Sequence, residues 1–308
     1  QYIASFIGVA PLEDARADNN PIRWNRSLSK AFDVAGEPLQ PGSIEWDWAS
    51  KFLEVPVSQI RQTSVQVPSV RMGSFLSALA VTLGERTYPR MAVRNFIGSA
   101  EAPPRYSVIQ LKATRSESLL VEGTAFHGTP EHGVVISYAP RWWGLAIEFY
   151  AREADAGEVY SIIERSWTLA LGEMNFLRGE AFSLSGEFLP ETGENLDSLV
   201  LDPKNIKPLQ RAVKNINTKR ATATNRGILM MGPPGTGKTM SLRVMRNEAE
   251  ATFIWVSSRD FHYSGVFGGI GQALDLAREL APSIVVFEDI DNWLDDQRHI
   301  DMLKSEMD

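Results

Sequence analysis

The chain has no cysteine, no long apolar run and no excess of basic residues, and each absence excludes a class of protein. Without cysteine there is no disulfide framework, no thiolate metal site and no cysteine nucleophile. The longest mainly apolar stretch, residues 75–83, is too short to cross a bilayer, and no signal-peptide pattern follows Gln1. The net charge of −7 argues against general affinity for nucleic acid or anionic membranes. We therefore expect a cytoplasmic protein with no membrane span in these residues and no nucleic-acid partner.

One stretch, GPPGTGKT at residues 232–239, fits the phosphate-binding loop pattern G-x-x-x-x-G-K-[ST] at every fixed position. It lies between an apolar run at 228–231 and a helical pattern. Its glycines let successive N–H groups point at an anion, at the positive end of the following helix. Lys238 would reach the β- and γ-phosphates, and the Thr239 hydroxyl would bind Mg²⁺. The predicted nucleotide-binding residues are Pro234, Gly235, Thr236, Gly237, Lys238, Thr239 and Met240.

Two adjacent carboxylates, Glu288 and Asp289, follow four apolar residues at 284–287. Such a run predicts a strand buried on both faces, as in a parallel sheet. Open α/β sheets bind their ligands at the carboxyl ends of these strands. The spacing from Lys238 to Glu288 leaves room for two crossover connections. We therefore expect the carboxylates to complete the site that the phosphate loop begins.

Hydrophobic periodicity predicts two domains. Residues 1–66 show no regular pattern, and we expect them to be irregular. Residues 67–189 predict an α+β amino-terminal domain that binds a substrate or partner, and the polar residues 190–195 predict a linker. Its predicted helices lie at 70–87 and 158–171, and its strands, in an antiparallel sheet, at 106–111, 118–121, 133–138, 145–149 and 182–188.

Residues 196–308 alternate between helix and strand patterns, which predicts an α/β domain with a parallel, doubly wound sheet. The first helix is expected at 206–216, and two more after Lys238 and near 271–280. The strands are expected at 227–231, 253–256 and 284–287. Because the chain opens on Gln1 and stops inside a helical pattern at Asp308, we expect it to be part of a longer protein.

The residues of this second domain resemble the AAA ATPases, and within them the protein-remodelling members. GPPGTGKT is the form of the loop that these members favour, and APSIVVFEDID at 281–291 is similar to their metal-binding strand. LDSLV at 196–200 lies where the family has its adenine-side segment. The resemblance implies an α/β P-loop NTPase fold, ATP and Mg²⁺ as cofactors, and ATP hydrolysis. It also implies self-association into a ring, typically a hexamer, that remodels or translocates a protein client.

The carboxylates depart from the family in their order, because the usual order is Asp then Glu. The reversed pair is similar to that of the mitochondrial translocase of the Rieske iron–sulfur protein and of its bacterial relatives. By position, Glu288 would orient Mg²⁺ through water and Asp289 would polarise the attacking water, with Lys238 as the third catalytic residue. The residues alone leave open which carboxylate has which role.

The family also implies a pore loop, in which an aromatic residue grips a threaded polypeptide between the second strand and the second helix. Residues 261–269 lie in this interval and offer either Tyr263 or Phe267. Two other functions stay open. A non-catalytic nucleotide-binding scaffold would agree with the reversed carboxylates. A nucleic-acid motor or loader would use the basic run Lys204, Lys207, Arg211, Lys214, Lys219, Arg220 and Arg226.

Overall fold

The computed structural model describes residues 5–10, 44–86, 88, 90–97, 100–218, 226–257 and 260–290. The chain divides into two compact units, one of Pro21–Phe176 and one that combines Gln1–Asn20 with Leu177–Asp308. The predicted linker at 190–195 therefore lies inside the second unit rather than between the two. No helix among the described residues is long and apolar enough to span a membrane.

The unit of Pro21–Phe176 is built on an antiparallel sheet of seven strands in the order β2-β8-β7-β6-β3-β4, with β5 paired to β6. Three helices accompany it, α3 (Ile44–Leu53), α4 (Met72–Glu85) and α5 (Ala156–Leu171). The strands are β2 (Ile60–Pro68), β3 (Arg90–Ile97), β4 (Ala100–Ala102), β5 (Arg105–Lys112), β6 (Arg115–Gly128), β7 (Gly133–Arg141) and β8 (Gly144–Arg152).

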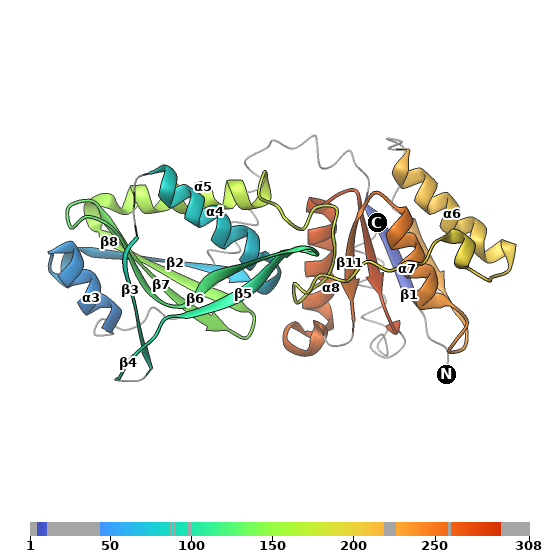
Figure 1. Cartoon of the computed structure of the whole chain (residues 1–308), viewed down its shortest axis with the longest axis horizontal. Helices are drawn as coiled ribbons and strands as arrows, with labels where there is room; N and C mark the ends of the chain where they lie inside the picture. Colours follow the sequence, from blue (N-terminus) through green and yellow to red (C-terminus); the bar gives the residue numbers. More distant parts are fainter. Residues whose placement is uncertain are drawn as a thin grey trace. The chain divides into compact units, whose positions relative to one another are not determined.

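Different helices cover the two faces of this sheet (Figure 1). Helix α3 packs against buried side chains that include Phe126, Val135 and Tyr150. Helices α4 and α5 pack on the other face in the larger core, which includes Val134 and Ile136. Because successive strand residues point to opposite faces, neighbouring residues of β7 enter different hydrophobic clusters. This explains why the strand lacks an apolar and polar alternation.

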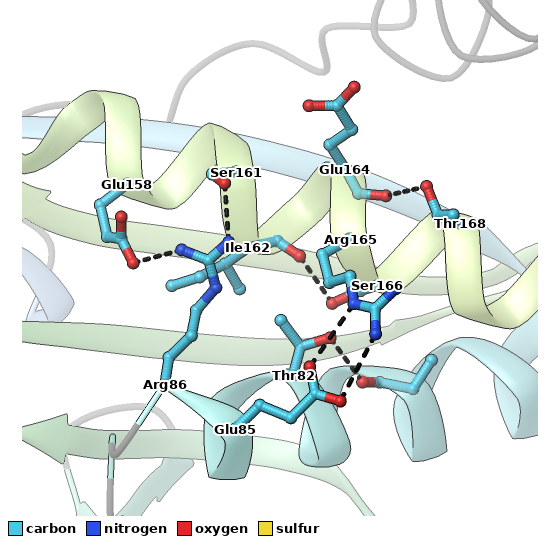
Figure 2. Close-up of polar contacts among 11 residues, drawn as sticks. Thr82, Glu85, Arg86, Glu158, Ser161, Ile162, Glu164, Arg165, Ser166 and Thr168 are labelled. Carbon is cyan, nitrogen blue, oxygen red and sulfur yellow. Dashed lines mark hydrogen bonds and ion pairs between the residues drawn. The ribbon is translucent and has the colours of Figure 1, made fainter. Parts of the chain in front are cut away.

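Polar contacts join α4 to α5 along one side of the helix pair (Figure 2). Arg86, the residue after α4, donates to the Glu158 carboxylate and, at 2.7 Å, to the Ser161 hydroxyl. Arg165 of α5 lies 3.4 Å from the Glu85 carboxylate of α4. These pairs cross between helices far apart in sequence, so they stabilise the tertiary packing rather than either helix alone.

The prediction that residues 1–66 are irregular is wrong for the described part of that range. Residues 44–53 form α3, residues 60–68 form β2, and residues 5–10 form strand β1 (Ser5–Ala10). Helix α3 shows little helical signal because it buries only a short stripe, Trp48, Ala49 and Leu53. Strand β2 is polar at most positions because one of its faces is partly exposed.

The second unit contains a five-stranded sheet in the order β10-β1-β12-β11-β9. Its strands after β1 are β9 (Ala181–Ser183), β10 (Arg226–Met230), β11 (Thr252–Val256) and β12 (Ser283–Phe287). Strand β12 is parallel to β11, and β11 is parallel to β9. Strand β1 is antiparallel to both of its neighbours, so the prediction of an entirely parallel sheet is wrong at this strand. A strand from the start of the chain needs no crossover connection and can enter the sheet in either direction.

Helices lie on both faces of this sheet (Figure 1). Helix α6 (Pro203–Asn217) and helix α7 (Lys238–Glu248) bury Leu209, Val213 and Met245 against Phe253 and other residues of one face. Helix α8 (Phe261–Glu279) is on the other side. The predicted strands at 227–231, 253–256 and 284–287 correspond to β10, β11 and β12. The predicted strand at 182–188 is shorter and belongs to this sheet as β9, not to the amino-terminal domain.

Two helices begin earlier than predicted. Helix α6 starts at Pro203 because the Asp202 carboxylate caps it, accepting from the Lys204 N–H at 2.9 Å. Helix α8 starts at Phe261 and includes four glycines, each of which costs about 1 kcal/mol in a helix. Its second half buries Ile270, Ala273 and Ala277, and this packing outweighs the weak local propensity.

Candidate functional site

The phosphate loop has a backbone that only its glycines adopt without strain. Gly235 and Gly237 have φ angles of +79° and +84°, in the left-handed region that other residues rarely occupy. A Cβ atom on Gly235 would meet nothing within 4 Å, so the backbone angle alone demands glycine there. Gly237 directly precedes α7, and the turn therefore ends with the N–H groups at the start of a helix.

Lys238 folds back over the loop. Its Nζ atom donates to the carbonyl oxygens of Gly232 and Pro233, both at 2.8 Å. The Thr236 hydroxyl donates to the same Pro233 oxygen at 2.8 Å. The ammonium group thus lies on the loop that was predicted to hold the phosphates. If an anion bound there, the ammonium group would exchange its carbonyl partners for charged oxygens, which are stronger acceptors for a cation.

The two motifs meet through Thr239 and Glu288. Thr239 is the second residue of α7, and its hydroxyl lies 3.3 Å from Glu288 Oε1, at the carboxyl end of β12. Glu288 is held by its backbone, since its N–H donates to the Val256 carbonyl of β11 at 3.0 Å. A hydroxyl and a carboxylate are hard oxygen ligands of the kind that Mg²⁺ prefers, together with phosphate oxygens and water. The residues present therefore fit this cation.

Asp289 differs from Glu288 in its backbone and contacts. Its φ angle is +51°, unusual for a residue with a side chain, although Asp tolerates this region better than most. Within the described part of the chain its carboxylate makes no hydrogen bond. Such backbone strain is typical of functional sites. The sequence indicated the carboxylate pair, but not that the two residues would differ in this way.

A segment before α6 approaches the phosphate loop from the side. Leu199 is buried, whereas Val200 is 97% exposed. A Cβ atom on Gly237 would lie 3.5 Å from Leu201 Cδ2, so Leu201 is in van der Waals reach of the loop. The predicted adenine-side segment, 196–200, ends one residue before this contact. Sequence reasoning missed Leu201, although Asp202 and Pro203 mark the helix start that places it there.

The other predicted residues are placed as follows. Pro234 is exposed in the phosphate loop, and Met240 is half-buried in the first turn of α7. Tyr263 and Phe267 lie in the first half of α8, so the prediction that 261–269 form a loop is wrong, and their role stays a prediction. The side chains of Lys204, Lys207, Arg211 and Lys214 lie on the exposed side of α6, and Lys204 pairs with Asp202 at 3.3 Å. Lys219 and Arg220 lie outside the described residues.

Known proteins match part of this chain. Residues 228–308 match the family described as ATPase family associated with various cellular activities (AAA). The chain is 40% identical over 94 residues to an ATP-dependent zinc metalloprotease FtsH of Kosmotoga olearia, which is 28% of this chain and 15% of that protein. It is 44% identical over 69 residues to a 26S proteasome regulatory subunit 6B homolog of Encephalitozoon cuniculi, which is 21% of this chain and 18% of the relative.

A proteasome-activating nucleotidase of Sulfurisphaera tokodaii is 42% identical over 69 residues, or 21% of this chain and 18% of that protein. The chain therefore spans less than one fifth of the length of these relatives. The family match begins in the strand that leads into the phosphate loop and continues past the carboxylate pair. Residues 228–308 are therefore an AAA ATPase domain, which belongs to the α/β P-loop NTPases.

Proposed function

We propose that this chain binds ATP with Mg²⁺ and hydrolyses it, as the motor of a ring-forming machine that remodels or translocates a protein client. The contact between Thr239 and Glu288 carries the proposal, because it joins the phosphate loop to the carboxylate strand at one edge of the sheet. The family match supports ATP as the nucleotide. The names of the relatives support a protein client, since one is an ATP-dependent protease and another activates the proteasome.

The residues would share the work in the following way. The loop from Pro234 to Thr239, with Met240 behind it, surrounds the phosphates, and Lys238 neutralises the β- and γ-phosphate oxygens. Thr239 and Glu288 hold Mg²⁺, which supplies charge stabilisation for the phosphoryl group when it is bound. Asp289, whose carboxylate has no partner within the described residues, orients and polarises the attacking water. This division of roles agrees with the contacts, because Glu288 lies within hydrogen-bond distance of Thr239 and Asp289 makes no such contact.

The remaining parts of the proposal concern assembly and client. Six subunits would form the ring, and Tyr263 or Phe267 would grip the polypeptide in its centre. The unit of Pro21–Phe176 would select the client. We expect no nucleic-acid partner, because the net charge of the chain is −7. Loss of client remodelling in Tyr263→Ala or Phe267→Ala, with ATP turnover retained, would identify the gripping residue; full remodelling in both would contradict that role.

The experiment that tests the site compares Glu288→Gln with Asp289→Asn, and uses Glu250→Gln, an exposed carboxylate in the same unit, as control. Steady-state ATP turnover is measured against Mg²⁺ and protein concentration, and nucleotide binding by calorimetry. We expect Asp289→Asn to lower turnover by about 10²- to 10⁴-fold while ATP still binds. We expect Glu288→Gln to need more Mg²⁺ for half-maximal turnover.

Each alternative has its own result. The opposite assignment of the carboxylates predicts that the two phenotypes exchange. A nucleotide-binding scaffold predicts that ATP binds but that wild-type turnover never exceeds that of Asp289→Asn. Specific activity that rises with protein concentration would support sites completed between subunits, and activity independent of concentration would contradict a ring that assembles in the range tested.

A further inference from the structure

The last turn of α7 holds the chain segment that leads to the nucleotide site. This segment, residues 189–198, is called the strap below. Arg246 donates to the carbonyl oxygens of Leu189, at 2.8 Å, and of Pro190. Asn247 donates to the carbonyl oxygens of Thr192, at 2.6 Å, and of Glu194, at 2.7 Å. Because the acceptors are backbone atoms, these contacts fix the path of the strap whatever side chains it carries.

Weaker contacts extend the same attachment. The Glu248 carboxylate accepts from the Leu196 N–H at 3.4 Å, and Arg243 lies 3.8 Å from the Glu194 carboxylate. At its far end the strap closes on itself, since Asn195 and Ser198 form a reciprocal capping box. Burial in this contact lowers the pKa of Arg246, against the opposing effect of nearby carboxylates. The strap is therefore bound along the last two turns of the helix that begins at the phosphate loop.

The other flank of the site is tied to the same place. Asn217, the last residue of α6, donates to the Glu248 carbonyl and accepts from the Glu250 N–H, both at 2.8 Å. Val200 and Leu201 lie between the strap and α6. The end of α7 thus holds the strap before these two residues and the far end of the helix that follows them. Arg246 itself is about 12 Å along the helix axis from Lys238, at 1.5 Å per residue.

Two apolar side chains follow the strap, Val200 and Leu201, and the second of them lies next to the phosphate loop. Leu201 is in van der Waals reach of Gly237, and Val200 is almost fully exposed although it is β-branched and apolar. A nucleotide whose phosphates lie in the loop extends its base beyond it, and apolar side chains are the usual partners of a flat ring. The exposed Val200 gains burial only if something packs on it.

We propose that Arg246 and Asn247 are positioning residues for the base of the nucleotide: through the strap they hold Val200 and Leu201 against the place where the base lies. The inference rests on the proposed nucleotide binding and adds residues that touch neither nucleotide nor metal. Their loss frees the strap, so that Val200 and Leu201 no longer offer a prearranged surface. Binding of the base must then order these two residues, and the free energy that this requires weakens the affinity for ATP.

The test separates the base from the phosphates. The dissociation constants of ATP and of inorganic tripolyphosphate, both with Mg²⁺, are measured by calorimetry for the full chain and for Arg246→Ala and Asn247→Ala. Arg211→Ala and Asn215→Ala are the matched controls, because both side chains are exposed on α6 and make no hydrogen bond or ion pair within the described residues. We expect ATP to bind about ten-fold more weakly to the strap variants, while tripolyphosphate binds equally to all.

Three results would overturn the proposal. Equal weakening of ATP and tripolyphosphate means that the strap contacts only support the fold of α7. Unchanged ATP affinity in both strap variants means that the base needs no such support. A wild-type chain that binds neither compound refutes the proposed function itself, and so is distinct from the first two. Asn247 is exposed, so Asn247→Ala leaves the core intact and decides the matter if Arg246→Ala does not fold.

Discussion

The two ion pairs between α4 and α5 allow a quantitative prediction about the unit of Pro21–Phe176, because they join the same helices in different surroundings (Figure 2). The side chains of Arg86 and Glu158 are 28% and 41% exposed, and Arg86 also donates to Ser161 at 2.7 Å. The side chains of Arg165 and Glu85 are 44% and 47% exposed and 3.4 Å apart. We therefore expect the first pair to be the stronger.

The magnitude follows from burial and from the number of hydrogen bonds. A part-buried arginine with a carboxylate and a hydroxyl partner should contribute about 1.5–2.5 kcal/mol, because hydrogen bonds to charged groups contribute about 1.5–3 kcal/mol. An exposed, long pair should contribute about 0.2–0.5 kcal/mol. Arg86→Ala should thus lower the free energy of unfolding several times more than Arg165→Ala.

Double-mutant cycles in urea measure the two couplings. Unfolding is followed by circular dichroism, because the fluorescence of the eight tryptophans of the chain would not isolate Trp167, which packs against Phe75 between α4 and α5. The cycle of Arg86→Ala with Glu158→Ala should give about 1 kcal/mol or more, and that of Arg165→Ala with Glu85→Ala less than about 0.5 kcal/mol. Equal couplings would refute the reasoning from burial and geometry.

Three further predictions concern other parts of the chain. Gly235→Ala should cost about 1–2 kcal/mol in backbone strain and weaken ATP binding in calorimetry, whereas Gly235→Asn should retain most affinity; equal losses would contradict the φ argument. Burial lowers the pKa of His127, so the folded unit favours the neutral imidazole. The unfolded chain therefore binds a proton more readily below about pH 6.5, and the free energy of unfolding should fall as the pH falls below that value. His127→Gln should reduce that loss in urea titrations at pH 7.5 and 5.5, and parallel pH profiles would speak against it. Because the chain has no cysteine, pairs of introduced cysteines can test the β1–β10 register, in which Ser5 is opposite Met230. A short thiol cross-linker should join Ser5→Cys to Met230→Cys faster than it joins Ser5→Cys to Leu229→Cys. Similar rates would exclude this register.

The local chemistry of the candidate site could be predicted from sequence because it depends on neighbouring residues. The glycines of the phosphate loop are required by the angles of their own backbone, and Lys238 and Thr239 follow directly at the start of α7. The buried run before Glu288 and Asp289 forms β12 as its composition indicates. The absence of cysteine likewise excludes thiol chemistry whatever the fold.

Other features depend on residues far apart in the chain, and local patterns do not encode them. Strand β1 enters a sheet whose other strands come from beyond residue 180, and its antiparallel direction follows from backbone pairing with β10 and β12. Helix α8 extends through glycines that would stop an isolated helix, because burial of its second half compensates. Glu288 reaches Thr239, and Arg246 and Asn247 reach the strap, only once the sheet aligns the ends of its strands and helices. Sequence thus determined which groups the site contains, and tertiary structure decided which of them meet, since contacts across a sheet are set by packing and not by spacing along the chain.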